Sequence, residues 1–407
     1  MQQLFYKCRE RDCLLLITLV ALSLYRTAGH AFWLVFSGRG LPQTPDSQWY
    51  INYANGLLEN FSIGLHIDEV LYLGYNLLLA LLLALFKTPA AVVLVQSVVA
   101  SLAIILVYKI AGILFNRNTA VLAGLFYLYI WDITFWSVHV LTDSFFVSLM
   151  LLCVYLLIRA LEPGQKIVRM FLTATSLYMC FFRPTGVLIM GMLLLYGVSR
   201  IDSSRVTGVL RRHWRVLGGF LAAVLCVTGY LYTSGKLDPL ICSFQYNAKL
   251  VLYNVYAKGW IYDKSTAYDY TFRPDYTIDI YDSLIMSFIV NNWEPVSVIY
   301  FRRAVAFLGT WAWETNIRNM GDVLYYGFKL LPLGIFIVGT VAAIRNGKFA
   351  QASILWLIIL AVFLFCVLLF IDAMYRYRFP AMPFMCIVIA YGAERIISGG
   401  RLLAKNG

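Results

Sequence analysis

The chain has 407 residues, of which 61% are hydrophobic and only 13% are charged, and its formal net charge is +12. Soluble domains usually hold about 45–50% apolar and about 25% charged residues, so this balance excludes a water-soluble globular protein, a disordered chain and a fibrous repeat. Many apolar runs approach the roughly 20 residues that a helix needs to cross hydrocarbon. The sequence therefore predicts an all-α, polytopic membrane protein.

Ten long apolar runs are the predicted transmembrane helices: residues 14–36, 90–115, 119–135, 144–161, 168–181, 186–198, 216–232, 323–343, 352–371 and 382–397. The first is too long for the apolar part of a signal peptide and is kept as a span. Two further segments, 70–86 and 296–313, are ambiguous. Arg302 and Arg303 lie in the middle of the second, and two arginines at mid-membrane depth would be costly, so we expect 296–313 to lie outside the bilayer.

The distribution of charge predicts how the chain is threaded. If 70–86 does not span, the cytoplasmic segments contain about 18 Lys and Arg and about 5 Asp and Glu. The external segments then contain about 14 Lys and Arg and about 16 Asp and Glu, a distribution that the positive-inside rule requires. A spanning 70–86 would instead place Arg211, Arg212 and Arg215 outside. We therefore expect 70–86 to be a horizontal or re-entrant interfacial helix, and both termini to be cytoplasmic.

With this threading, residues 1–407 form a single membrane domain, with a first external loop at 37–88 that carries horizontal helices and a large external loop at 234–322. The positive excess lies mostly in short cytoplasmic loops, where it orients the protein, so membrane lipids and not nucleic acid are the expected partners. The eight cysteines form no Cys-x-x-Cys pair and lie mostly in apolar runs, which favours buried small side chains over disulfides or a metal site.

Two acidic residues at the external ends of predicted helices are candidate catalytic groups. Asp46 follows a proline shortly after the first span, and Asp143 lies in a Leu-Thr-Asp-Ser segment where another span begins. Each also has the position of a helix cap or first-turn residue, and this ordinary structural role stays open for both. Two carboxylates from separate elements at membrane level equally suit a general base or the positioning of a substrate.

Arginines also occur at the external ends of predicted spans. Arg183 lies in a turn between two short spans, and Arg376 and Arg378 alternate with tyrosines in the loop before the last span. Snorkelling and interfacial anchoring explain such residues in many membrane proteins. A guanidinium group at headgroup depth also matches a lipid phosphate with two parallel hydrogen bonds, and Arg302 and Arg303 could do the same from the large external loop.

Several short motifs follow one another in a recognisable order: Asp-Ser-x-x-Tyr at 46–50, Leu-Gly-Tyr-Asn at 73–76, Leu-Thr-Asp-Ser-Phe-Phe at 141–146, Arg-Pro-Thr-Gly at 183–186 and Arg-Tyr-Arg-Phe-Pro at 376–380. Together they resemble the GT-C class of integral-membrane glycosyltransferases, of the protein mannosyltransferase and aminoarabinose transferase type. The resemblance runs across nearly the whole chain. Two departures are Asp-Ser where many relatives have Asp-Glu, and Asn76 where they have a proline.

The resemblance implies a polyprenyl-phosphate sugar donor and an inverting transfer on the external face to a glycan, lipid or protein acceptor. It implies that Asp46 is the catalytic acidic residue of the first external loop and that Asp143 is the second acidic position. Arg376 or Arg378 would then lie near the lipid phosphate. The further candidate substrate-binding residues are Tyr50, Arg183, Arg302 and Arg303. No metal ligands are predicted, although the cofactor stays open, because a divalent cation could lie beside the carboxylates.

The resemblance also implies a bacterial inner membrane, undecaprenyl phosphate as the carrier, a role in the cell envelope and a site that faces the periplasm. Two other classes of function stay open. A lipid-linked sugar flippase or transporter would favour charged helices at mid-membrane depth and inverted repeats, whereas the acidic residues here gather at one face. A lipid-carrier glycan ligase or polymerase would share the external arginines and differ in the size of its acceptor.

Overall fold

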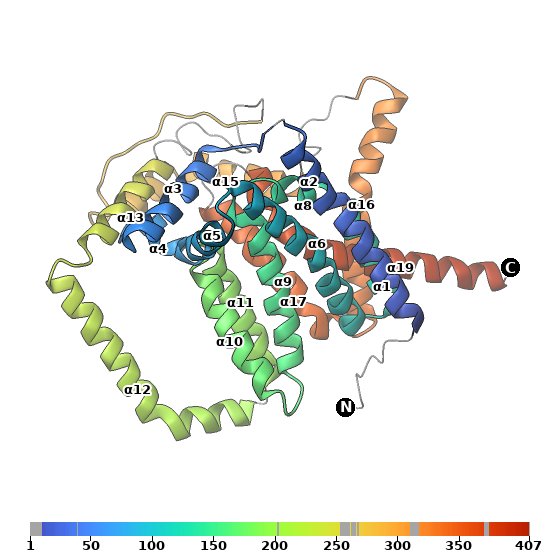
Figure 1. Ribbon diagram of the computed structural model, residues 1–407, viewed down its shortest axis with the longest axis horizontal. Helices are drawn as coiled ribbons and strands as arrows, with labels where there is room; N and C mark the ends of the chain where they lie inside the picture. The colour runs from blue at the N-terminus through green and yellow to red at the C-terminus, as the bar shows by residue number, and fades with distance from the viewer. Residues whose placement is uncertain are drawn as a thin grey trace.

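The computed structural model describes residues 10–38, 40–201, 203–252, 261, 266, 268–309, 317–369 and 374–406. Throughout these residues the regular structure is helical, and long helices form a bundle with shorter helices at one end (Figure 1). The predicted all-α, polytopic membrane fold is confirmed.

The helices at the predicted transmembrane positions are α1 (Glu10–Ser23), which continues through a π-helical turn (Leu24–Ala28) into α2 (Gly29–Phe36), α6 (Pro89–Leu114), α7 (Arg117–Tyr129) with α8 (Trp131–Ser137), α9 (Thr142–Ala160), α10 (Lys166–Cys180), α11 (Thr185–Arg200), α12 (Ser203–Thr233), α16 (Met320–Arg345), α17 (Phe349–Leu364) with a second π-helical turn (Phe365–Leu369), and α19 (Met382–Asn406). The remaining helices are α3 (Pro45–Asn60), α4 (Ile67–Leu71), α5 (Leu73–Phe86), α13 (Asp238–Leu250), α14 (Leu284–Asn291), α15 (Trp293–Leu308), α18 (Met374–Tyr377) and a 3-10 turn (Phe379–Ala381).

Among the described residues, six helical stretches are long and apolar enough to cross a membrane, and a seventh is added if α7 and α8, bent by 52° at their junction, count as one span. Helices stand at all ten predicted positions, but α10 and α11 have only 15 and 16 residues. At 1.5 Å per residue each covers about 22–24 Å of a hydrocarbon core about 30 Å thick. Ten spans are therefore not confirmed. Residues 310–313 and 370–371 of the predicted segments lie outside the described residues.

The centre of the bundle is formed by α6, α7, α9 and α19. Beside it, α16 crosses α19 at two glycines. A Cβ atom on Gly339 would lie 2.3 Å from the carbonyl oxygen of Val388, and one on Gly392 would lie 2.3 Å from that of Ile335. Small residues allow membrane helices to approach this closely. The crossing fixes α19, and with it the short helix α18 that precedes it.

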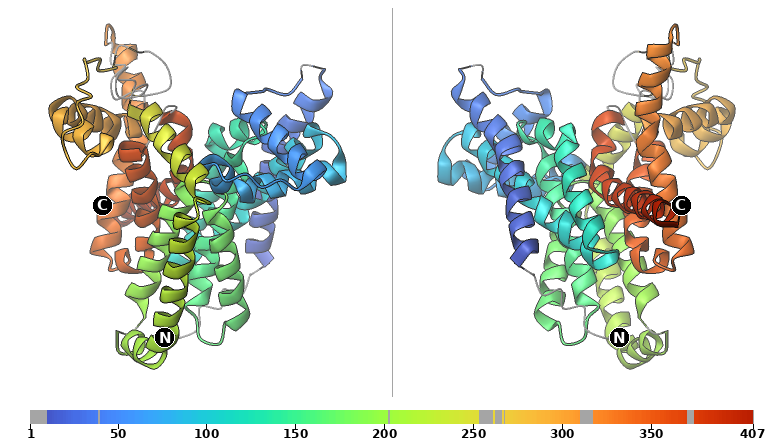
Figure 2. Two further views of the ribbon diagram at one scale, coloured as in Figure 1. Left: turned by 90° about the vertical axis from the view of Figure 1, so that its left-hand side faces the viewer. Right: turned by 90° about the vertical axis from the view of Figure 1, so that its right-hand side faces the viewer.

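The ambiguous segment 70–86 falls mainly on α5, which packs against α3 and α6. With 14 residues, α5 covers about 21 Å, which is too short for the hydrocarbon core. Figures 1 and 2 show α3, α4 and α5 gathered at one end of the bundle. This arrangement is consistent with an interfacial helix. The boundaries expected for the two external loops, 37–88 and 234–322, stay predictions.

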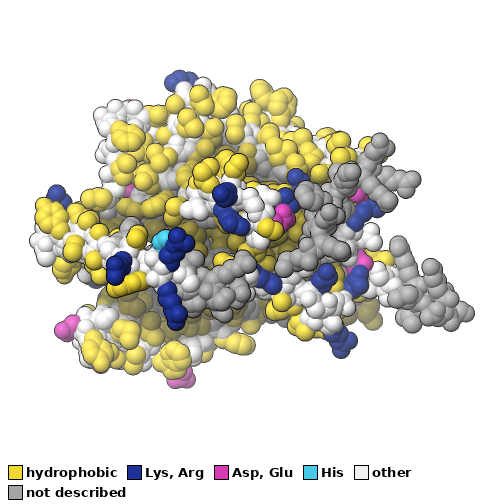
Figure 3. Space-filling model, turned by 90° about the horizontal axis from the view of Figure 1, so that it is seen from below, with side chains coloured by type: hydrophobic (Ala, Val, Ile, Leu, Met, Phe, Trp, Pro, Cys, Tyr) yellow, Lys and Arg dark blue, Asp and Glu magenta, His cyan; other side chains and the backbone are white. Residues whose placement is uncertain are grey.

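The two predicted external loops meet. The side-chain amide of Asn247 on α13 donates to Asp68 Oδ2 on α4 at 3.4 Å, and the backbone N–H of Ile67 donates to Ser243 Oγ at 2.8 Å. Seen from the other end, the molecule presents Lys and Arg side chains among hydrophobic ones (Figure 3). This is the charge expected of a cytoplasmic face. The orientation of the chain and of its termini stays a prediction.

Candidate active site

Asp143 lies in the first turn of α9 and is fully buried. Its Oδ1 accepts a hydrogen bond from Arg183 Nη1, and its Oδ2 lies 2.9 Å from both Nε and Nη2 of Arg376. The N-cap of α9 is Leu141, which makes no side-chain hydrogen bond. The carboxylate of Asp143 therefore pairs with two guanidinium groups and does not cap its helix.

Asp46 lies in the first turn of α3, where Thr44 is the N-cap and accepts a hydrogen bond from the Ser47 backbone N–H at 3.1 Å. Asp46 Oδ2 accepts a hydrogen bond from Arg376 Nη1 at 2.6 Å. The Asp46 side chain is 54% exposed, whereas that of Asp143 is 0% exposed. Of the two carboxylates, only that of Asp46 is accessible to a substrate.

Arg376 joins these two carboxylates from α18, the short helix between the π-helical turn after α17 and the start of α19. Asp46, 330 positions earlier in the chain, and Asp143, 233 positions earlier, meet at its guanidinium group. With Arg183, the cluster contains two acidic and two basic side chains, so its charges balance. Hydrogen bonds between ionised groups are about twice as strong as neutral ones, and such a network fixes the geometry of its members.

The turn between α10 and α11 places Arg183 beside Asp143. At the start of α5, the Gly74 backbone N–H donates to the carbonyl oxygen of Phe181 at 2.6 Å, and Tyr178 Oη donates to the carbonyl oxygen of Gly74 at 2.7 Å. The first N–H groups of a helix have no partner within the helix. Here one of them holds the turn that carries Arg183.

The contact between the Gly74 backbone and the Phe181 carbonyl oxygen should be sensitive to substitution of Gly74. A Cβ atom there would lie 2.9 Å from the Phe181 carbonyl oxygen, so Gly74→Val should force α5 and the turn apart and destabilise the protein by about 1–3 kcal/mol. Thermal unfolding in detergent or nanodiscs measures the loss. Gly191→Val on α11 is the matched control, because a Cβ at Gly191 meets no atom within 4 Å. Equal unfolding midpoints for the two variants would contradict the role of this contact.

Aromatic side chains surround the ion pairs. The guanidinium of Arg376 lies 5.7 Å from the centre of the Trp136 ring. Burial raises the pKa of the Tyr50 hydroxyl well above its ordinary value, although the nearby arginines oppose the shift. Within the described part of the chain, Tyr75 Oη and Trp136 Nε1 are buried and have no hydrogen-bond partner. Buried polar atoms are normally paired, so these two are exceptions within the aromatic surroundings of the ion pairs.

Arg303 and Arg378 form a second group of cations beside the first. Arg303 is fully buried on α15, and its Nη1 lies 3.4 Å from a backbone carbonyl oxygen of the second π-helical turn. Arg378 Nη1 lies 3.4 Å from a carbonyl oxygen of α15. Arg378 directly follows Tyr377, whose ring centre lies 4.8 Å from the guanidinium of Arg183. The two groups of arginines are therefore neighbours.

Arg302 lies elsewhere, in the large predicted external loop. Its Nη1 donates to the backbone carbonyl oxygens of Tyr268 and Asp269, and its guanidinium lies 5.2 and 5.3 Å from the ring centres of Tyr268 and Tyr270. These contacts attach that segment to α15. Among the sequence-predicted residues, those that the structure brings together around the ion pairs are Asp46, Tyr50, Asp143, Arg183 and Arg376.

Among the described residues, no three His, Cys, Asp or Glu side chains converge as metal ligands. The position between Asp46 and Asp143 is held by the guanidinium of Arg376. This set of groups fits an anion beside the arginines better than a divalent cation between the carboxylates.

For four residues around the ion pairs, the sequence alone does not indicate a place in the site. Gly74 and Tyr75 belong to the Leu-Gly-Tyr-Asn motif, which marks their position but not what they touch. Trp136 and Tyr377, whose rings lie under Arg376 and Arg183, look like ordinary interfacial aromatics. Only the tertiary contacts distinguish them from the many other aromatic residues of the chain.

Residues 73–232 match the family model described as dolichyl-phosphate-mannose-protein mannosyltransferase, which is a GT-C type glycosyltransferase family. The matched segment contains Gly74, Asp143 and Arg183, whereas Asp46 precedes it and Arg376 follows it. No curated protein matches the chain. Over residues 73–232 the chain is therefore similar to the GT-C type glycosyltransferases, in agreement with the resemblance carried by its motifs, and this match supports the activity of a membrane glycosyltransferase.

Proposed function

We propose that the protein transfers a sugar, with inversion, from a polyprenyl-phosphate donor to an acceptor hydroxyl group on the external face of a bacterial inner membrane, with undecaprenyl phosphate as the carrier. The observation that carries the proposal is the guanidinium of Arg376, which joins the accessible carboxylate of Asp46 to the buried carboxylate of Asp143. A carboxylate and a cation side by side supply what sugar transfer from a phosphate requires: a base for the acceptor and a partner for the leaving group.

Asp46 is the proposed general base. The acceptor oxygen attacks the anomeric carbon from the face opposite the phosphate, its proton passes to Asp46, and the bond between the anomeric carbon and the phosphate oxygen breaks. One displacement of this kind inverts the configuration of the sugar. The polyprenyl phosphate leaves as a stabilised anion, so no strong general acid is needed. The 54% exposure of the Asp46 side chain supports this role, because the base must reach the acceptor.

Arg376 and Arg183 are the proposed phosphate ligands, with Arg303 and Arg378 beside them. Negative charge grows on the phosphate as the bond breaks, and preorganised cations stabilise that charge most in the transition state. Asp143 is a positioning residue in this scheme, because both of its oxygens are engaged by arginines and no substrate can reach it. A phosphate that binds Arg376 competes with Asp46, which leaves the carboxylate of Asp46 free to accept a proton.

Donor consumption tests the proposal. Purified protein in nanodiscs is incubated with a panel of undecaprenyl-phosphate sugars and a membrane extract that supplies acceptors, and mass spectrometry follows the donor and the released undecaprenyl phosphate. We expect one donor to be consumed, with release of undecaprenyl phosphate, and no change with empty nanodiscs. A product whose anomeric configuration equals that of the donor would contradict inversion. Labelled donor that crosses the bilayer of proteoliposomes intact would indicate a transporter instead.

A further inference from the structure

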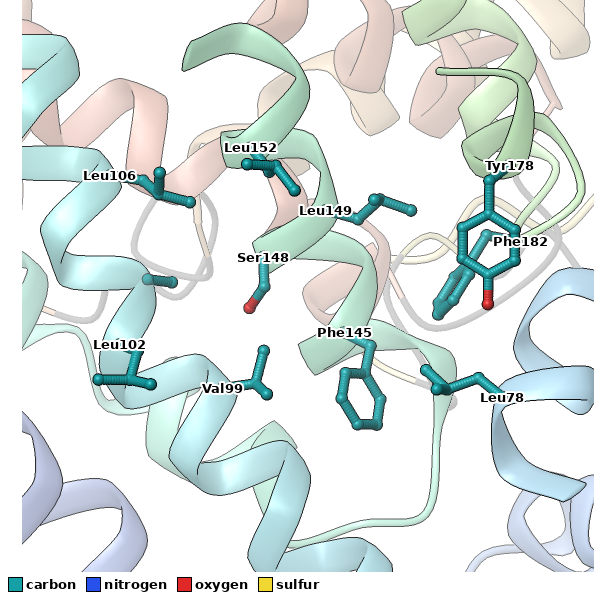
Figure 4. A pocket seen from close by; sticks show the side chains of 11 residues that line it. Leu78, Val99, Leu102, Leu106, Phe145, Ser148, Leu149, Leu152, Tyr178 and Phe182 are labelled. Atoms are coloured by element: carbon teal, nitrogen blue, oxygen red, sulfur yellow. The ribbon is translucent and has the colours of Figure 1, made fainter. Parts of the chain in front are cut away.

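An apolar cavity of about 310 Å³ lies between the helices of the N-terminal half of the bundle. It is lined by side chains of α5, α6, α9 and α10 and by Phe182 of the following turn, and Figure 4 shows them around the open space. Ser148 and Tyr178 supply its polar atoms, and both are already hydrogen-bonded: Ser148 Oγ donates to Ser144 O, and Tyr178 Oη donates to Gly74 O. The walls therefore offer a ligand hydrocarbon contacts.

Size and chemistry point to a hydrocarbon chain as the occupant. The cavity volume of about 310 Å³ is roughly twice that of an engineered apolar cavity of about 150 Å³ that binds benzene, so the space is large enough for part of a hydrocarbon chain. Leu102, one of the lining residues, is 40% exposed on α6. Because α6 is one of the candidate membrane spans, the rim of the cavity reaches a surface that faces lipid.

The cavity begins beside the ion pairs. Its lining residue Phe145 follows Asp143 by two positions on α9, and Phe182 directly precedes Arg183. The lining continues along α9 to Leu152, seven residues or about 10 Å further from the charged end. A lipid whose chain lies in the cavity therefore has its head group at the level of the carboxylates.

The cavity and most of the arginines belong to different halves of the bundle. The described residues that line it come from α5, α6, α9, α10 and the turn after α10. In contrast, Arg303 lies on α15, Arg376 lies on α18 and Arg378 directly follows α18. In Figure 2, the blue helices α3 to α5 and the orange-to-red C-terminal helices stand on opposite sides of the bundle. Arg183 is the exception, because it directly follows the lining residue Phe182. Since three of the four arginines assigned to the donor lie on the C-terminal side, the proposal places the polyprenyl chain of the donor there and leaves the cavity to a second lipid.

We propose that this cavity holds the hydrocarbon chain of the acceptor, so that the acceptor is itself a lipid with a hydroxyl-bearing head group. The inference rests on the proposed function, which assigns the donor phosphate to the arginines and the acceptor hydroxyl to Asp46. Helix α3, which carries Asp46, packs on α5, and Leu78 of α5 lines the cavity. Chain and head group of one acceptor molecule thus contact neighbouring helices on the same side of the site.

Photolabelling in nanodiscs tests this assignment without the need for catalysis. Three probes carry a diazirine on the chain: dodecyl glucoside as an acceptor-like lipid, farnesyl phosphate as a donor-like lipid and phosphatidylglycerol as a bulk lipid. Labelled peptides are mapped to residues 99–106 and 145–152. We expect the glucoside to label both stretches in preference to the other two probes. Leu149→Trp, which fills the cavity, should weaken this labelling about tenfold, the effect of about 1.4 kcal/mol of lost contact.

Leu194→Trp is the matched control, because Leu194 is 59% exposed on α11 and does not line the cavity. It should leave the labelling unchanged. Preferential labelling by farnesyl phosphate would assign the cavity to the donor chain, and equal labelling by phosphatidylglycerol would assign it to bulk lipid; either result overturns the inference. The donor-consumption assay is independent of the probes, so a wild-type protein that consumes donor while the glucoside fails to label the cavity refutes the acceptor assignment alone.

Discussion

Replacing Asp46 by asparagine is expected to remove nearly all sugar transfer while the protein stays folded. Asparagine has the same shape and can still face Arg376, but it cannot accept the proton of the acceptor hydroxyl. A general base usually contributes about 10²–10⁴-fold, so kcat should fall by about 10³-fold. The Asp46 side chain is 54% exposed, and exposed ion pairs contribute about 0–1 kcal/mol. Arg376, which is 11% exposed, keeps its contact with Asp143, so the unfolding temperature should change little. Release of undecaprenyl phosphate and thermal unfolding are measured on the same nanodisc preparation.

Glu59→Gln is the matched control for this variant, because it neutralises another exposed carboxylate near the far end of α3. Both kcat and the unfolding temperature should remain those of the wild type. Substantial transfer by Asp46→Asn would remove Asp46 from the role of base. A large loss of stability would show instead that its ion pair with Arg376 mainly holds the first external loop in place.

The charged residues of the site stand out in the sequence, but their pairing does not. Asp46, Asp143, Arg183 and Arg376 each lie near the external end of a predicted span, where a charge in an apolar or aromatic setting is unusual. Which guanidinium meets which carboxylate depends on contacts across as many as 330 positions. The motif that contains Arg376 and Arg378 does not distinguish them, whereas in the structure Arg376 contacts both carboxylates and Arg378 contacts a backbone carbonyl.

For the fold, too, the local sequence predicts some features and leaves others to tertiary packing. Apolar runs predict where helices lie, because a chain in hydrocarbon must satisfy its backbone hydrogen bonds within each helix. They do not predict how many of those helices cross the membrane, since α10 and α11 are short and α7 and α8 are bent against each other. Glycines in apolar runs, such as Gly74 and Gly392, carry no local sign of the backbone that approaches them.

Asp143→Ala is expected to cause the largest loss of stability at the site, in addition to loss of transfer. Arg183 is 1% exposed and donates to Asp143, so the variant leaves a guanidinium buried without its counter-charge. Removing one partner of a buried ion pair typically costs about 3–5 kcal/mol. Lower membrane expression and a lower unfolding temperature in nanodiscs should both report this cost.

The double variant Asp143→Ala/Arg183→Leu separates folding from chemistry. It removes both buried charges, and apolar replacement of a buried ion pair is often neutral or stabilising, so most of the lost unfolding free energy should return. Transfer should stay absent, because the donor phosphate has lost Arg183 and Arg376 has lost the carboxylate that orients it. A double variant as unstable as Asp143→Ala would mean that the unpaired charge is not the cause of the loss. Transfer that returned together with stability would limit Asp143 and Arg183 to a role in folding.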